Sequence, residues 1–125
     1  MSARLSTVVI DCHDPRTLAD FWARVLGWKV LDVDDDGSVE IGDGEGNGPR
    51  LLFERVPEAK TIKNRIHLDI NPVGADQTEE LDRLLDLGAQ RVDIGQGEQT
   101  WVVLADPEGN EFCLLRTQME AASAG

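Results

Sequence analysis

Basic residues are scarce in this sequence of 125 residues, which contains 12 lysines and arginines against 24 aspartates and glutamates. The formal net charge at pH 7 is therefore −12. Proteins that bind nucleic acids or anionic membranes need a basic surface to neutralise phosphate groups. The charge balance therefore excludes both classes, and we expect neither a nucleic-acid nor a membrane partner.

Long hydrophobic runs are also missing, because the longest covers only residues 101–105. A membrane-spanning helix needs about 20 apolar residues, and the N-terminal residues MSARLSTVV lack the pattern of a secretory signal peptide. The only two cysteines, Cys12 and Cys113, lie far apart in strand-like segments, which favours free thiols in a reducing compartment. We therefore expect a cytoplasmic protein.

The composition that remains is typical of a folded domain, with 41% hydrophobic and 29% charged residues. A chain of this length suits one domain with its own core. We predict a single domain over residues 1–125, with a frayed tail of small residues at 117–125.

The sequence repeats itself at a nearly constant spacing. The matching pairs are Leu26-Gly27 with Leu87-Gly88 and residues 43–47 (DGEGN) with residues 106–110 (DPEGN). We interpret this as a tandem duplication, with repeat one at about 5–55 and repeat two at about 64–116.

Each repeat has the order β-α-β-β-β. Asp14 and Pro15 are an N-cap and a first-turn proline for a helix that Gly27 ends, and Asp76 and Glu79 are spaced as a capping box. Hydrophobic periodicity then predicts helices at 15–26 and about 76–87, and strands at 5–12, 28–33, 38–42, 50–55, 64–71, 90–94, 99–105 and 111–116.

Alternation along these strands separates two faces. One is apolar and is expected to pack against the helices: Val8, Ile10, Val39, Ile41, Leu51, Phe53, Ile66, Leu68, Ile70, Val102, Leu104, Phe112 and Leu114. The other is mixed and mostly polar, and it includes Thr7, Asp11, Arg50, Glu54, Arg65, His67, Asp69, Trp101, Val103 and Cys113. This second face either meets water or lines a concave cup that the two repeats share. Trp101 favours the cup, because a large aromatic among polar residues suits a ligand.

The paired modules, together with the segments at 14–28 and 104–112, resemble the vicinal oxygen chelate (VOC) superfamily, which includes glyoxalase I, extradiol dioxygenases and the bleomycin and fosfomycin resistance proteins. The segments at 50–58 and 64–69 resemble its glyoxalase-like domain branch. The resemblance implies an α+β fold in which two βαβββ modules form a curved mixed sheet with a concave cup. It also implies a homodimer, as in the resistance proteins.

Metalloenzymes of this superfamily place ligands on four strands, and the strict alignment puts Thr7, Leu52, Arg65 and Cys113 at those positions. A guanidinium at a ligand position opposes a cation. We therefore expect no metal and no other cofactor. An alternative register brings Glu54, His67 and Cys113 to the site, and it would make the protein a metal-dependent lyase or dioxygenase.

The leading hypothesis is a metal-free protein that binds a small organic molecule in the cup, with an unassigned activity. His67 and Asp69 are the candidate acid–base pair. The candidate ligand-binding residues are Trp101, Arg65, Arg50, Glu54, Thr7, Asp11 and Cys113. An antibiotic-binding resistance protein of the bleomycin type fits the same residues.

Overall fold

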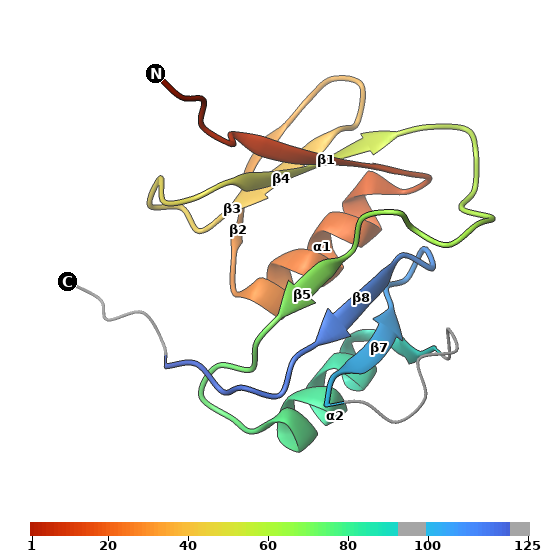
Figure 1. Cartoon of the computed structure of the whole chain (residues 1–125). Helices are drawn as coiled ribbons and strands as arrows, with labels where there is room; N and C mark the ends of the chain where they lie inside the picture. The colour runs from red at the N-terminus through yellow and green to blue at the C-terminus, as the bar shows by residue number, and fades with distance from the viewer. Residues whose placement is uncertain (93–99, 121–125) are drawn as a thin grey trace. The chain divides into compact units, whose positions relative to one another are not determined.

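The computed structural model describes residues 1–92 and 100–120. It divides the chain into two compact units, Met1–Thr61 and Ile62–Gly125 (Figure 1). Within these described residues, each unit contains one helix and one four-stranded sheet with parallel and antiparallel pairs, as the α+β prediction requires. In the described residues, neither helix is long and apolar enough to span a membrane.

The first unit follows the predicted β-α-β-β-β order. Its elements are β1 (Thr7–Cys12), α1 (Pro15–Leu26), β2 (Lys29–Val33), β3 (Val39–Gly42) and β4 (Arg50–Arg55). The sheet order is β1-β4-β3-β2, in which β1 runs parallel to β4 and the other pairs are antiparallel.

Helix α1 forms where its sequence signals predict it. The Asp14 side chain accepts a hydrogen bond from the Thr17 backbone N–H at 3.2 Å, and Pro15 occupies the first turn. Gly27 ends the helix with a φ of 67°, a conformation that favours glycine. The apolar stripe packs into the core of the unit through Leu18, Phe21, Trp22 and Val25, all buried.

The second unit repeats this topology with shorter strands. Its elements are β5 (Leu68–Ile70), α2 (Gln77–Leu87), β6 (Gln90–Arg91), β7 (Val102–Ala105) and β8 (Glu111–Leu114). The sheet order is β5-β8-β7-β6, and β5 is parallel to β8. The sheet therefore has the same connections as the first.

Helix α2 begins with the predicted capping box, since Asp76 accepts from the Glu79 backbone N–H at 2.9 Å and Glu79 accepts from that of Asp76. The leucines of α2 are only partly buried. Leu84 is fully buried, but Leu85 is 36% exposed and Glu80 is buried instead. Glu80 tolerates this position because both its oxygens accept hydrogen bonds from Arg83, at 2.7 and 2.8 Å.

Several strand predictions are too long. The strand predicted at 64–71 covers only Leu68–Ile70, and Ile66, expected in the core, is 80% exposed because it lies at a bend before the strand. The strand predicted at 90–94 covers Gln90–Arg91, with 93 and 94 outside the described residues.

The predicted frayed tail is wrong at its beginning. The Met119 backbone N–H donates to the Pro72 carbonyl oxygen at 2.8 Å, and an Asn71 side-chain N–H donates to the Thr117 carbonyl oxygen at 3.0 Å. Residues 121–125 lie outside the described part of the chain.

The predicted apolar face is buried along the central strands, where Ile41, Phe53, Leu104, Phe112 and Leu114 are at most 1% exposed. On β7 and β8, two residues assigned to the opposite, polar face are buried as well, Val103 at 2% and Cys113 at 7% exposure. The opposite side of β7 and β8 is therefore not simply a solvated surface. It lines part of a cavity.

Candidate functional site

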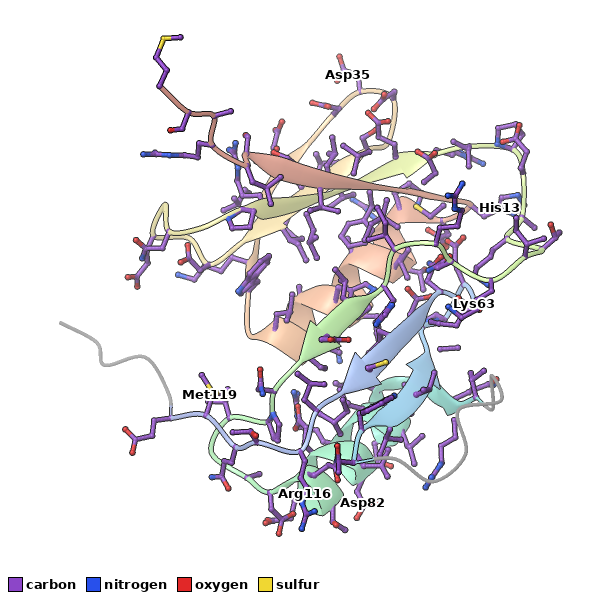
Figure 2. The ribbon with its side chains drawn as sticks, viewed as in Figure 1. His13, Asp35, Lys63, Asp82, Arg116 and Met119 are labelled. Atoms are coloured by element: carbon purple, nitrogen blue, oxygen red, sulfur yellow. The ribbon has the colours of Figure 1, made fainter. Side chains whose placement is uncertain are left out.

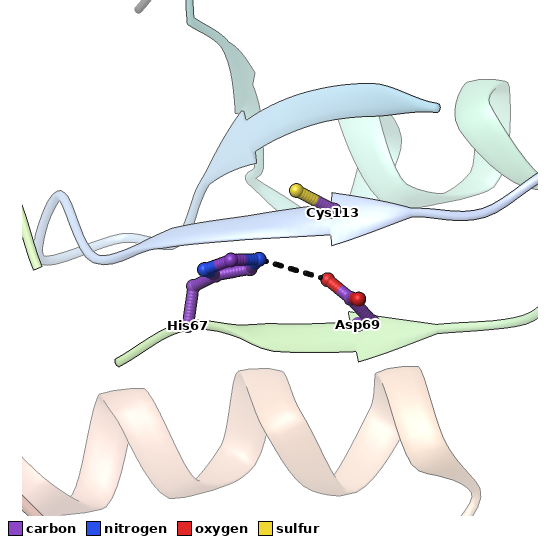
Figure 3. Close-up of side chains that lie close together, drawn as sticks. All are labelled: His67, Asp69 and Cys113. Atoms are coloured by element: carbon purple, nitrogen blue, oxygen red, sulfur yellow. Dashed lines mark ion pairs between the residues drawn. The ribbon is translucent and has the colours of Figure 1, made fainter. Parts of the chain in front are cut away.

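Three chemically active side chains meet on the second sheet (Figure 3). His67 immediately precedes β5, Asp69 lies within β5, and Cys113 lies on β8 directly opposite Asp69 in the parallel register. His67 Nε2 and Asp69 Oδ1 are 3.0 Å apart. His67 and Asp69 are two residues apart, which places their side chains on one side of an extended chain.

Burial determines the protonation state of Cys113. It raises the pKa of the Cys113 thiol, and the charge and hydrogen bond of Asp69 raise it further, while the ammonium of Lys63 acts in the opposite direction. The thiol is therefore protonated at neutral pH and donates to the Asp69 carboxylate. This environment makes Cys113 a poor nucleophile.

The carboxylate also orients the histidine ring. Because Asp69 is acceptor-only when ionised, the nitrogen that faces it, His67 Nε2, carries a hydrogen. In the neutral ring, Nδ1 then keeps its lone pair and can accept a hydrogen bond or a proton. The side chains of both residues are close to half exposed, at 43% and 49%, so a ligand can reach them.

The cluster forms one wall of a cavity of about 290 Å³ in the second unit. Residues from β5, β7, β8 and the flanking segments line it: Lys63, His67, Asp69, Trp101, Val103, Glu111, Cys113 and Leu115. Trp101 lies at the bend before β7 and is 38% exposed, which leaves a substantial aromatic surface uncovered. The cavity therefore combines an apolar wall with a few polar groups, as ligand sites do.

A family model described as a glyoxalase-like domain matches residues 7–115. This chain belongs to that family. No curated protein matches the sequence. The match confirms the resemblance to the VOC superfamily.

Solved structures share the fold of this glyoxalase-like domain. A glyoxalase/bleomycin resistance protein/dioxygenase family enzyme from Burkholderia phytofirmans is 21% identical, with coverage of 90% of this chain and 97% of that one and a TM-score of 0.64. The fosfomycin resistance protein FosX from Listeria monocytogenes, complexed with Mn(II) and a dihydroxypropylphosphonic acid, is 14% identical, with coverages of 92% and 90% and a TM-score of 0.68. TioX from Micromonospora is 20% identical, with coverages of 91% and 98% and a TM-score of 0.57. Such low identities establish the fold alone.

Four predicted site residues of the glyoxalase-like domain come together in this cavity: His67, Asp69, Cys113 and Trp101. Arg65 does not line it, because β5 begins at Leu68 and the alternation that grouped Arg65 with His67 does not extend that far. Arg65 is exposed at a bend, and its contact with a ligand stays a prediction.

The other four predicted residues lie in the first unit. Thr7 pairs with Arg50 and Asp11 with Glu54 in the parallel register of β1 and β4. The Arg50 guanidinium donates to Glu40 and to the Ser6 hydroxyl, each at 3.1 Å. Glu54 contributes to a separate cavity of about 640 Å³, whose lining also includes His13, Asp36, Ser38 and Arg55. Ligand binding by these four residues stays a prediction.

Some lining residues were missed from the sequence. Lys63 lies between the two predicted repeats, and Leu115 lies just beyond β8, so neither belongs to a strand whose alternation could identify it. Val103 was predicted on the polar face and Glu111 begins the predicted strand at 111–116, but nothing local distinguished either residue as part of a cavity.

The same cluster offers donors for a metal ion. One ligand atom each from His67, Asp69 and Cys113 lies within 4.8 Å of the others. The superfamily register had suggested Glu54 as the carboxylate, whereas here Asp69 of the same unit provides it. A nitrogen, a sulfur and an oxygen suit zinc, while the harder manganese prefers oxygen-rich sites.

Proposed function

We propose that this glyoxalase-like domain binds a small organic molecule in the cavity of the second unit without the help of a metal. The observation that carries the proposal is that the partly exposed Trp101 lines the same cavity as the His67–Asp69 pair. An aromatic face supplies affinity that tolerates different ligands, and an oriented imidazole supplies a directional polar contact.

Each residue has a distinct role in this proposal. Trp101 stacks on the flat part of the ligand, and His67 Nδ1 accepts a hydrogen bond or a proton from a polar substituent. Asp69 fixes the ring through the 3.0 Å contact with Nε2. Cys113, kept protonated by burial and by Asp69, is a neutral wall residue.

The first experiment uses protein treated with EDTA, so that binding cannot depend on a divalent ion. Aromatic, carbonyl and carboxylate metabolites that do not absorb the excitation light, together with bleomycin, are added while tryptophan fluorescence is recorded. We expect a saturable change with at least one compound. The change should disappear in Trp101→Leu and persist in Trp28→Phe, which alters a tryptophan outside the cavity.

Absence of a response in the whole panel, or a response that Trp101→Leu leaves intact, would contradict the proposal. Sedimentation velocity on the same sample tests the predicted homodimer separately, and a monomer at all concentrations would contradict that expectation.

A second candidate function is metal binding, which the proximity of the three donor atoms favours. His67, Asp69 and Cys113 would hold a zinc-like ion, which supplies a Lewis acid to a bound ligand when present. Binding requires the Cys113 proton to leave, so affinity should rise with pH.

Metal analysis of the purified protein and thermal shifts with added zinc separate the two candidates. Stoichiometric zinc that is lost in both His67→Ala and Cys113→Ser, but retained in Cys12→Ser, favours the metal site. Ligand binding by metal-free protein with no zinc-dependent shift favours the first candidate.

A further inference from the structure

The charged side chains that line the cavity of the second unit differ in the contacts that they make with neighbouring groups. Asp69 Oδ1 lies 3.0 Å from His67 Nε2, and the ligand atoms of His67, Asp69 and Cys113 lie within 4.8 Å of one another. Glu111 accepts from the Asn64 backbone N–H at 3.0 Å. Both carboxylates therefore have polar neighbours, although they keep their negative charges.

Lys63, which is labelled in Figure 2, is the one basic residue other than His67 among the described residues that line this cavity. Its ammonium donates to the Asn64 carbonyl oxygen at 3.3 Å, and it forms no ion pair within residues 1–92 and 100–120. Lys63 belongs to the lining of the same cavity as Cys113, and its charge lowers the pKa of that thiol. An ammonium has three donors, so Lys63 retains donors for a ligand.

The size of the cavity limits the rest of the ligand. An apolar cavity of about 150 Å³ accommodates benzene, which has six non-hydrogen atoms. The cavity here is about 290 Å³, roughly twice as large. By that comparison it accommodates a molecule of about twelve non-hydrogen atoms, which corresponds to a one-ring or two-ring compound.

We propose that the ligand of this site is a small aromatic carboxylate, whose anionic group pairs with Lys63 while its ring stacks on Trp101. This inference rests on the proposed function and adds the charge and the size of the ligand. The chain as a whole carries −12 and repels anions, so a preference for an anion must come from a local contact. At about 0.15 M salt, charges more than roughly 8 Å away are largely screened, whereas a contact pair is not.

Three compounds with the same ring system test the proposal: naphthoate, its neutral isostere naphthamide, and the cationic naphthylmethylamine. Their affinities for the metal-free protein are measured by calorimetry at about 0.15 M salt. We expect naphthoate to bind about tenfold more tightly than naphthamide, the size of effect that a charge-assisted hydrogen bond gives. The amine should bind most weakly.

Lys63→Met removes the charge and keeps most of the apolar stem. We expect this variant to bind naphthoate and naphthamide equally, with the affinity for naphthamide unchanged. Lys29→Met, which removes an exposed lysine of the first unit, should keep the tenfold preference.

The outcomes separate the two levels of inference. The unmodified protein could bind the carboxylate and the amide equally and lose both in Trp101→Leu. That result would overturn the proposal that the ligand is an aromatic carboxylate, and it would leave the proposed binding function standing. A carboxylate preference that persists in Lys63→Met would overturn the role of Lys63. No binding of any of the three compounds would overturn this inference, and an independent failure of the metabolite panel would be needed to overturn the proposed function.

Discussion

Replacing Trp101 with alanine gives the most direct test of the binding site. Trp101 lies at the bend before β7, outside the strand itself, and is 38% exposed. Its substitution therefore removes aromatic surface from the cavity without opening a hole in the core. We expect Trp101→Ala to keep the fold and to lose affinity for an aromatic ligand.

The size of the loss follows from the exposed area of the side chain. A tryptophan buries up to about 250 Å², so the 38% that remains exposed corresponds to about 95 Å². At about 25 cal/mol per Å², a ligand that covers this surface completely gains about 2.4 kcal/mol, and one that covers half gains about 1.2 kcal/mol. The affinity should therefore fall between about 7-fold and about 50-fold.

Calorimetric titration with naphthoate measures this change. Trp101→Phe, which keeps an aromatic face, should retain most of the affinity, and Trp28→Phe should retain all of it. Denaturant unfolding of each variant shows whether the fold is intact. A folded Trp101→Ala variant that binds naphthoate within about twofold of the unmodified protein would refute the stacking role.

Three further predictions concern the carboxylates. Asp69→Asn should lower the pKa of the Cys113 thiol, because it removes a charge that raises this pKa. Alkylation of Cys113 by iodoacetamide should therefore be faster near pH 8. Because the thiol stays buried, its pKa should remain above its ordinary value. Asp76→Ala removes the N-cap of α2 and should lower the free energy of unfolding by about 1 kcal/mol in denaturant titrations. Hydrogen bonds from Thr17 lower the pKa of Asp14 in the folded chain. The ionised carboxylate therefore stabilises the fold at pH values above the unfolded pKa of about 3.9. This contribution is lost as the pH falls through the lower pKa of the folded state. The stability advantage of the unmodified protein over Asp14→Asn should therefore shrink between about pH 5 and pH 2.

Each of these predictions has an internal control. Cys12 is buried in the first unit, so unchanged alkylation of Cys12 shows that Asp69→Asn has not opened the whole chain. Asp82 lies on an exposed part of α2, and Asp82→Ala should change the free energy of unfolding by less than about 0.5 kcal/mol. An equal loss in Asp76→Ala and Asp82→Ala, unchanged Cys113 alkylation, or a pH-independent Asp14 difference would contradict the corresponding reasoning.

The helices were predictable because their signals are local. Asp14 and Gly27 bound α1, and Asp76 and Glu79 close the first turn of α2, through hydrogen bonds that span only a few residues. Such contacts depend on the sequence alone, and the structure confirms them. The repeated order of elements was predictable for the same reason, because two copies of one sequence pattern fold alike.

The strand ends were less predictable. A strand needs a partner with which to pair, and β5 pairs with β8 only over Leu68–Ile70. Ile66 has the apolar side chain of a core residue but is exposed, because no neighbouring strand reaches its position in the described sheet. Hydrophobic periodicity indicates which side chains could be buried. Strand pairing in the folded chain decides which of them are buried.

The sequence by itself determined that the chain is an acidic α+β protein built from two similar modules, and it named His67, Asp69, Trp101 and Cys113 as candidates. Only the tertiary structure placed these four around one cavity and added Lys63 to it. The physical reason is that the parallel register between β5 and β8 brings Asp69 opposite Cys113, and no local signal encodes that long-range alignment. The cavity and the ammonium in its lining are therefore properties of the fold, although each side chain in them was visible in the sequence.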